Sequence, residues 1–375
     1  MKIAVGSTSK IPSETANSIQ MIMACQGLVQ NGHEIRVWVP DLESTSFEKL
    51  RKHYGLICQK FKIHSLVSFR YFKRLDFSAS MILRAFLWNP DLVYTWTIPV
   101  AAFAAFLGAT IVLEVHDIPT GKLGTALFNS FIRSDADKRL VFVSNELQRR
   151  VKERFPNLKD GECVIAPNGV ELQDYQDLPD TAEAKRQLGF PEGMIVSCSG
   201  HLYAGRGVDL FLEMARRFPS VHFYWFGGNS EQVSFYSRQA AENGLENVVF
   251  TGFIPKSELP LAQAASDILI MPYGKNIAGS SGGDSAAICS PMKMFEYLAA
   301  GKPILTSDLP VIHEVLNTET AVFCEAENTD SWAEALQTLL ADPALRESLS
   351  ASARKESLKH SWQQRAEQIT AFMRG

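Results

Sequence analysis

The amino-acid sequence predicts an α/β protein made of two doubly wound domains. Short apolar runs alternate with amphipathic helical runs along the 375 residues, which is typical of parallel sheets covered by helices. The alternation runs through residues 1–170, is interrupted by the polar and acidic residues 171–183, and then starts again. A chain of this length is expected to form two or three domains. We therefore expect a domain linker within residues 171–183 and a ligand cleft between the two domains.

The first domain is predicted over residues 1–170. Its helix over residues 18–30 ends at an Asn-Gly pair, which is a strong stop signal. The apolar run 98–113 is interrupted by a proline and a glycine and is shorter than the roughly 20 residues that cross a bilayer. We interpret it as a buried helix over residues 100–107 that leads into a strand. The strands of this domain are predicted at residues 2–5, 34–39, 63–66, 92–95, 110–115 and 140–143.

The second domain is predicted over residues 171–360. It is expected to have a helix over residues 208–217, directly after a glycine-rich segment. The C-terminal residues 361–375 show apolar side chains at helical spacing, and we expect this helix to pack back onto the first domain. The strands of the second domain are predicted at residues 194–198, 221–226, 248–252, 268–271, 304–307 and 321–324.

Charge and cysteine usage limit the partners and the compartment. The net charge is −4, but residues 1–170 carry +6 (21 Lys and Arg against 15 Asp and Glu) and the remainder carries −10. A basic first domain fits a membrane surface or an anionic acceptor, and ordinary surface variation explains it equally well. The six cysteines show no C-x-x-C pair, as expected for free thiols in a reducing compartment. We expect a cytoplasmic protein without a signal peptide, either soluble or peripheral on the inner face of the membrane, with no nucleic-acid partner.

The segment from Ser290 and Pro291 to residue 303 carries the most informative pattern. Lys293 and Glu296 lie three residues apart at the start of a predicted helix, so they share one face of it. A cation there opposes the helix dipole unless an anion is bound at the same place. A carboxylate one turn later suits sugar hydroxyls. The segment therefore predicts a site for a nucleoside diphosphate.

A glycine-rich segment follows the first strand of the second domain. Gly200, Gly205 and Gly207 would let a phosphate approach the backbone, and Arg206 could bind its oxygens. The alternative is a strand-to-helix turn with a solvated arginine. The G-x-G-x-x-G fingerprint does not occur in the sequence, which disfavours a nicotinamide or flavin dehydrogenase.

His116 and Asp117 come at the end of a predicted buried strand, where open α/β sheets place their ligands. Glu114 and Asp117 flank the imidazole, and either could tune it. The alternative is a strand-end histidine bonded to backbone. The polar loop before the first helix, with Ser13 and Asn17, suits an acceptor, although helix capping explains much of it.

Other chemistries find little support in the sequence. It contains no G-x-S-x-G elbow and no H-E-x-x-H or similar ligand spacing, so no metal is expected. The charge of a leaving group would have to be neutralised by Arg206, Lys293 and amides at helix starts. The basic and aromatic cluster at residues 70–74 fits a solvated surface or a lipid contact.

Taken in order, these segments resemble the family 4 (group 1) glycosyltransferases of the GT-B fold, with two Rossmann-like domains, over essentially the whole chain. The resemblance is carried by His116-Asp117, the glycine-rich segment, the segment 290–303 and several short fragments. These fragments are Ala16-Asn17-Ser18, Asn31-Gly32-His33-Glu34, Pro167-Asn168-Gly169-Val170 and Gly252-Phe253-Ile254-Pro255.

The resemblance implies metal-independent, retaining transfer of a sugar from a nucleotide-diphosphate donor to a glycan, a glycolipid or another acceptor of the cell envelope. The first domain would bind the acceptor and the second the donor, with no cofactor beyond the co-substrate. Arg206 and Lys293 would hold the diphosphate, Glu296 the ribose, and Phe253 would lie by the base. His116 would stand near the reacting sugar.

Two positions depart from the family pattern. Ile288 occupies the place of a glutamate that usually contacts the donor sugar, so the donor cannot be named; the loop 274–289, with Asp284, could supply replacement contacts. His201 stands where an arginine is common, and Arg206 where a lysine is common. A GT-B epimerase and a non-catalytic GT-B protein that binds sugar nucleotides or scaffolds an assembly therefore stay open as alternatives.

Overall fold

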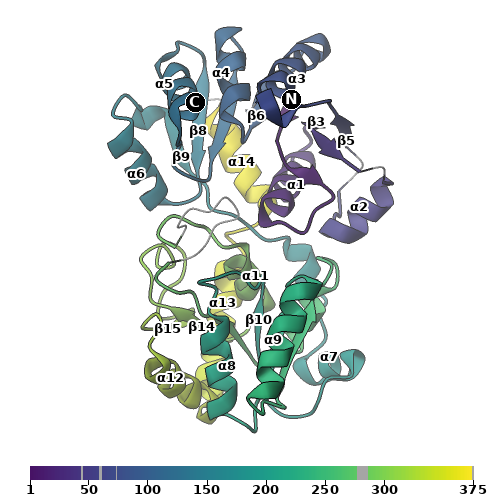
Figure 1. Cartoon of the computed structure of the whole chain (residues 1–375), viewed down its shortest axis with the longest axis vertical. Helices are drawn as coiled ribbons and strands as arrows, with labels where there is room; N and C mark the ends of the chain where they lie inside the picture. The colour runs from purple at the N-terminus through teal and green to yellow at the C-terminus, as the bar shows by residue number, and fades with distance from the viewer. Residues whose placement is uncertain (44, 59–60, 73, 277–285, 374–375) are drawn as a thin grey trace. The chain divides into compact units, whose positions relative to one another are not determined.

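The computed structural model describes residues 1–43, 45–58, 61–72, 74–276 and 286–373. The chain divides into two compact units, one formed by Met1–Asn168 with Trp362–Gly375 and the other by Gly169–Ser361 (Figure 1). The chain thus passes between the units at residues 168–169 and 361–362. Residues 171–183, the expected linker, instead lie inside the second unit and contain helical segments.

The first unit contains a parallel sheet with the strand order β5-β3-β1-β6-β7-β8-β9 among the described residues. The strands are β1 (Lys2–Gly6), β3 (Glu34–Val39), β5 (Lys62–Ser65), β6 (Leu92–Thr95), β7 (Ile111–Val115), β8 (Lys138–Phe142) and β9 (Cys163–Ile165), and β2 (Lys10–Ile11) pairs separately with β4 (Asp41–Leu42). The helices are α1 (Ala16–Gln30), α2 (Phe47–Tyr54), α3 (Leu75–Trp88), α4 (Ile98–Phe106), α5 (Lys122–Arg133), α6 (Asn145–Arg154) and α14 (Trp362–Phe372), with 3-10 turns η1 (Arg70–Phe72) and η2 (Asp160–Glu162).

The C-terminal helix α14 packs beside α1 in the first unit (Figure 1). The two backbones approach closely at Gly27, where an added Cβ would lie 2.7 Å from the carbonyl carbon of Trp362. Asn31 Nδ2 also donates to the carbonyl oxygen of Gln363 at 2.9 Å. A glycine is therefore needed at position 27 to let the last helix of the chain reach the first.

The second unit repeats the architecture with the strand order β12-β11-β10-β13-β14-β15. Its strands are β10 (Ile195–Ser199), β11 (His222–Phe226), β12 (Val248–Gly252), β13 (Ile268–Met271), β14 (Ile304–Ser307) and β15 (Ala321–Cys324). Its helices are η3 (Leu172–Tyr175), α7 (Thr181–Leu188), α8 (Val208–Arg217), α9 (Ser230–Glu242), α10 (Leu259–Ala264), α11 (Met292–Ala300), α12 (Thr329–Ala341) and α13 (Pro343–Ser357).

The predicted α/β class is confirmed, and most strands lie within a residue or two of their expected positions. The largest shift concerns β8, expected at residues 140–143, which begins at Lys138. Lys138 is buried, and its ammonium donates to the carbonyl oxygen of Ser134 at 2.6 Å and pairs with Glu162 at 3.2 Å. Apolar patterning cannot reveal a lysine that is buried in this way.

The strand order places the segments that were predicted to bind ligands at the carboxyl ends of the strands. In each sheet the order reverses at one point, between β1 and β6 in the first unit and between β10 and β13 in the second. Ligands of doubly wound sheets bind at such points. The glycine-rich segment follows β10, and His116 follows β7, next to β6.

No helix of the described residues is long and apolar enough to cross a membrane. The apolar run 98–113 becomes the helix α4 and the buried strand β7.

Candidate functional site

The glycine-rich segment forms a tight loop between β10 and α8. Gly200, Gly205 and Gly207 have positive φ angles of 130°, 77° and 82°, which side chains with a Cβ rarely adopt. Gly207 caps α8, and an added Cβ there would lie 2.7 Å from the carbonyl carbon of Pro272. The carbonyl oxygen of Gly205 accepts a hydrogen bond of 2.9 Å from Gly274. The loop is thereby fixed against the chain that follows β13.

Two cations meet at one tyrosine beside this loop. Arg206 Nη1 donates to the Tyr273 hydroxyl at 3.0 Å, and its guanidinium carbon lies 5.1 Å from the centre of that ring. Lys293 Nζ lies 5.0 Å from the same ring centre and 5.8 Å from that of Trp225, and donates to Cys198 Sγ at 3.4 Å. An added Cβ at Gly200 would lie 3.4 Å from Lys293 Nζ. The loop and the start of α11, far apart in sequence, thus form one site.

These cations have no carboxylate partner among the described residues. Lys293 is only 8% exposed, yet its ammonium contacts a thiol and two aromatic rings. Arg206 Nε is buried without a hydrogen-bond acceptor. A buried cation is normally paired, because removing it from water is unfavourable. Two cations that have no carboxylate partner in the described part of the chain, beside a glycine loop and a helix start, are suited to binding an external anion such as a diphosphate.

Glu296 is buried on α11 and has its own partners. Lys256 Nζ forms a short ion pair with Oε1, and Gln263 Nε2 donates to Oε2 at 3.4 Å. Gln263 also donates to the Ser199 hydroxyl at 3.4 Å, which connects this carboxylate to the end of β10. Lys256 and Gln263 were not predicted from the sequence. The one sign of them is that a buried glutamate requires a cation nearby.

A second carboxyl group lies close to Glu296. Burial, together with the neighbouring charges of Glu171 and Glu296, raises the pKa of Asp174 to about 7 even though Lys256 opposes the shift. Asp174 comes from η3, inside the segment that was expected to be a linker. This segment thus contributes directly to the surroundings of Glu296.

The remaining residues that were predicted to bind the donor lie on the same sheet edge or next to it. Ser290 precedes Pro291, which is the N-cap of α11. Phe253 is half-buried and follows Gly252 at the end of β12. Ile288, at the position of the missing glutamate, is buried. Asp284 and most of its loop lie outside the described residues.

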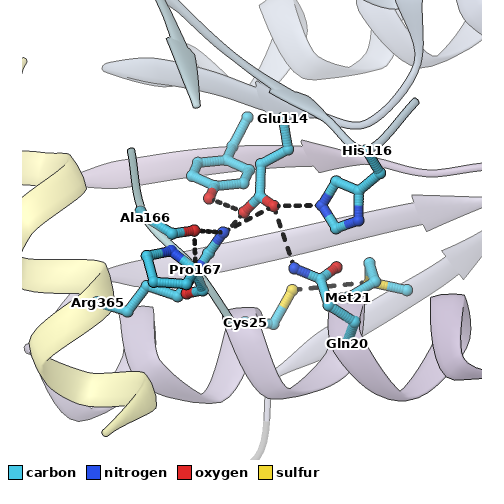
Figure 2. Close-up of polar contacts among 9 residues, drawn as sticks. Gln20, Met21, Cys25, Glu114, His116, Ala166, Pro167 and Arg365 are labelled. Atoms are coloured by element: carbon cyan, nitrogen blue, oxygen red, sulfur yellow. Dashed lines mark hydrogen bonds and ion pairs between the residues drawn. The ribbon is translucent and has the colours of Figure 1, made fainter. Parts of the chain in front are cut away.

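In the first unit, His116 belongs to a buried polar cluster around Glu114 (Figure 2). His116 Nε2 lies 2.8 Å from Glu114 Oε2. Arg365 of α14 donates to both oxygens of Glu114, at 2.8 and 3.0 Å, and Gln20 Nε2 donates to Oε2 at 3.1 Å. Tyr94 donates a short hydrogen bond to Oε1. Burial alone would raise the pKa of Glu114, but Arg365 and His116 hold it well below its usual range.

The sequence left open whether Glu114 or Asp117 acts on the imidazole of His116, and the contacts of this cluster identify Glu114. Glu114 contacts the imidazole, whereas Asp117 Oδ1 accepts from the backbone of Ile118 at 2.7 Å. The Ser13 hydroxyl is engaged with Thr15 in a local turn, and Asn17 is exposed on the first turn of α1. Arg365 lies 251 residues from Glu114 in the sequence, so their pairing could not be predicted from local patterns. The one available sign was that a buried glutamate needs a cation as a partner.

The described residues contain no group of three or more His, Cys, Asp or Glu side chains that could hold a metal ion.

Two family models match the chain, one to each unit. Residues 19–174 match the model described as Glycosyltransferase Family 4, and residues 180–356 match that of the group 1 glycosyl transferases. The chain belongs to the group 1, family 4 glycosyltransferases. The resemblance noted in the sequence is thus confirmed, and the two doubly wound units are those of a GT-B glycosyltransferase.

Relatives of this glycosyltransferase differ in the sugars and acceptors that they are named for. The chain is 27% identical to a GDP-mannose-dependent alpha-(1-6)-phosphatidylinositol monomannoside mannosyltransferase of Mycolicibacterium smegmatis, with 65% of this chain and 64% of the relative aligned. It is 23% identical to an alpha-galactosylglucosyldiacylglycerol synthase of Streptococcus pneumoniae, with 66% of each aligned. The chain therefore spans slightly less than two thirds of these relatives. The crystal structure of Anabaena HepE in complex with UDP shares the fold at a TM-score of 0.75 and 17% identity, covering 100% of both chains.

Proposed function

We propose that this protein is a retaining, metal-independent glycosyltransferase that moves a sugar from a nucleotide-diphosphate donor to a lipid-linked or other glycan acceptor of the cell envelope. The observation that carries the proposal is the pair of cations Arg206 and Lys293, which share Tyr273 and have no carboxylate partner among the described residues. Family membership and the nucleotide complex of the HepE structure support the same donor class.

The donor side of the reaction is assigned to the second unit. Arg206, Lys293 and the amides at the starts of α8 and α11 would neutralise the negative charge that develops on the departing diphosphate, which is the role a metal ion has in other transferases. Glu296 would accept hydrogen bonds from the ribose hydroxyls by exchanging part of its contact with Lys256. Phe253 would contact the base, and the backbone around Ser290 and Pro291 would border the phosphates.

The sugar and the acceptor are assigned to groups of the first unit. His116 would hydrogen-bond the reacting sugar and stabilise the charge that develops on it. Ser13, Asn17 and Asp117 border the carboxyl edge of the sheet, where an acceptor hydroxyl would be held. The names of the two relatives, a mannosyltransferase of phosphatidylinositol monomannoside and an alpha-galactosylglucosyldiacylglycerol synthase, favour a lipid-linked acceptor.

A nucleotide panel tests the donor assignment. We expect UDP, GDP or ADP, or one of their sugars, to raise the melting temperature of the protein, and EDTA to leave this shift unchanged. The same donor should then be consumed when a membrane lipid extract is added, with retention of the anomeric configuration in the product. Failure of every nucleotide to bind would overturn the proposal. Binding without hydrolysis or transfer would favour the non-catalytic alternative, to which the buried Ile288 gives some support.

The outer face of α3 and the end of α4 suggest how a lipid acceptor is reached. These two helices pack together, and five of their large apolar side chains face solvent. We call these residues the α3 face: Leu83 (66% exposed), Phe86 (41%), Leu87 (82%), Phe106 (89%) and Leu107 (53%). An apolar surface of this kind marks an interaction site.

Positive charge accompanies the α3 face. Besides burial, the cations Arg36, Lys62 and Arg84 lower the pKa of His64, which shows that all three lie close to that imidazole. Arg84 is itself exposed on α3 between the apolar residues. Apolar side chains combined with cations fit the surface of an anionic bilayer. We propose that the α3 face attaches the enzyme peripherally to such a bilayer.

Vesicle sedimentation tests the membrane contact. We expect the protein to sediment with phosphatidylglycerol vesicles more than with phosphatidylcholine vesicles, and less at high salt. The double variant Leu83→Gln, Leu87→Gln should weaken binding about tenfold or more, because two leucines no longer leave water. The control Phe235→Gln, Leu358→Gln changes two exposed apolar residues of the second unit and should bind like the wild type. Equal loss in both variants would contradict the contact.

A further inference from the structure

We infer that Glu114, Arg365, Tyr94 and Gln20 form a positioning network that fixes His116 in one tautomer, and that the C-terminal helix α14 is thereby a working part of the active site. The inference rests on the proposed function in one respect, since it takes His116 as the group that meets the reacting sugar. The network itself stands on contacts within the first unit.

Glu114 is the centre of the network because its carboxylate is saturated. Oε1 accepts from Tyr94 and from Arg365 Nη1, and Oε2 accepts from Gln20, Arg365 Nη2 and His116 Nε2. A carboxylate offers about four lone-pair sites, so none is left for another partner. Glu114 is 2% exposed, and its contacts come from α1, β6, α14 and the residue that follows its own strand (Figure 2). The carboxylate can therefore move only if several elements move with it.

The ionised state of Glu114 determines which nitrogen of His116 carries a proton. Arg365 and His116 hold the pKa of Glu114 well below its usual range in spite of burial, so its oxygens only accept hydrogen bonds. His116 Nε2, 2.8 Å from Oε2, must then be protonated. In the neutral ring Nδ1 is left as the acceptor, and Figure 2 shows it on the side of the ring away from the carboxylate. The network thus presents Nδ1 to a sugar hydroxyl, which donates to it.

Arg365 makes this arrangement depend on α14. Its guanidinium forms the bidentate pair with Glu114 and also donates to the carbonyl oxygens of Ala166 (3.1 and 3.2 Å) and Pro167 (2.8 Å). Those two residues come just before the chain leaves the first unit, and Arg365 follows shortly after the chain returns at Trp362. Without the guanidinium, a buried carboxylate would lose its charge partner and would tend to protonate. A protonated Glu114 could donate to the imidazole and reverse the tautomer.

The alternative is that the ion pair between Glu114 and Arg365 only stabilises the fold. In that case its loss would leave the tautomer of His116 unchanged, whereas a positioning role predicts a change. In ¹⁵N-histidine-labelled protein, the long-range ¹H–¹⁵N spectrum distinguishes an Nε2–H from an Nδ1–H ring. The signal of His116 among the eight histidines is identified by its loss in His116→Gln. We expect the Nε2–H form in the wild type and a mixture or the Nδ1–H form in Arg365→Met.

Kinetics provide the second readout. We expect Arg365→Met to lower kcat about 10- to 100-fold, by analogy with the loss of a partner that orients a metal-bound histidine, with little change in KM for the donor. Arg365→Lys should recover part of kcat and of the Nε2–H signal. If Arg365→Met does not fold, Arg365→Gln, which keeps a hydrogen-bond donor but removes the charge beside Glu114, applies the same test. Gln368→Ala, which removes a hydrogen bond from α14 to the carbonyl oxygen of Ile165, should match the wild type.

The two failures are distinguishable. A wild type that transfers no sugar while His116 shows the Nε2–H form would overturn the proposed function and leave the network in place. An active wild type with the Nδ1–H form would overturn the network. So would an Arg365→Met variant that keeps both the wild-type tautomer and the wild-type kcat.

Discussion

The Lys293→Met variant is expected to weaken nucleoside-diphosphate binding by about 1.5–3 kcal/mol, the range for a hydrogen bond to a charged group, or roughly 10- to 150-fold. The physical reason is that the ammonium is buried and stands beside the glycine loop without a carboxylate among the described residues. An incoming phosphate would give the ammonium an anionic partner, which the described residues do not supply. Titration calorimetry with the nucleotide that gives the largest thermal shift measures the effect.

The same substitution should leave the stability of the free protein unchanged or raise it. A methionine of similar length still fills the space beside the rings of Trp225 and Tyr273 that the ammonium faces, and it removes a desolvated charge that has no carboxylate partner among the described residues. The control Lys359→Met removes a cation of the second unit that is paired with Glu356 at the surface, and its affinity for nucleotide should equal that of the wild type. Lys293→Met protein with full affinity would exclude Lys293 from the diphosphate site.

The sheets could be predicted from the sequence because their strands are buried on both faces. Strand β13 is a continuous apolar run, and β6 and β14 are buried along their whole length and begin with apolar residues, which is the pattern of a parallel sheet covered by helices on both faces. The two-residue strands β2 and β4 give no comparable pattern. The placement of the linker was wrong because polarity alone indicated it, whereas η3 within that segment packs against α11.

The candidate site was predictable only where its residues lie close together in sequence. The spacing of Lys293 and Glu296 and the glycines before α8 gave local signals. The contacts that complete the site join distant segments. Tyr273, which lies between Arg206 and Lys293, follows the end of β13. The ion pair of Glu296 with Lys256 joins α11 to the turn that follows β12. The periodicity of apolar residues does not indicate which distant side chains pair, although each buried charge predicts that it has a partner.

The substitution Gly27→Ala is expected to have the largest effect on stability, a loss of about 3 kcal/mol or more. Overpacking alone commonly costs about 1–3 kcal/mol, and here the new methyl group meets backbone, the carbonyl group of Trp362, which cannot rotate away. The clash has to be relieved by moving α14 off α1. That movement would pull Arg365 from Glu114, and breaking a buried ion pair costs about 3–5 kcal/mol when one charge stays buried. The two losses share one displacement, so they are not simply added.

Chemical unfolding and hydrogen exchange measure this effect. The midpoint of unfolding should fall, and the amides of α14 should exchange faster than those of the sheet. Gly124→Ala is the matched control, because Gly124 lies in helix α5 of the same unit and an added Cβ there meets nothing within 4 Å. The control should be neutral or slightly stabilising, since alanine favours a helix by up to about 1 kcal/mol over glycine. If both variants unfolded alike, the close approach of α1 and α14 would not be what holds Arg365 on Glu114.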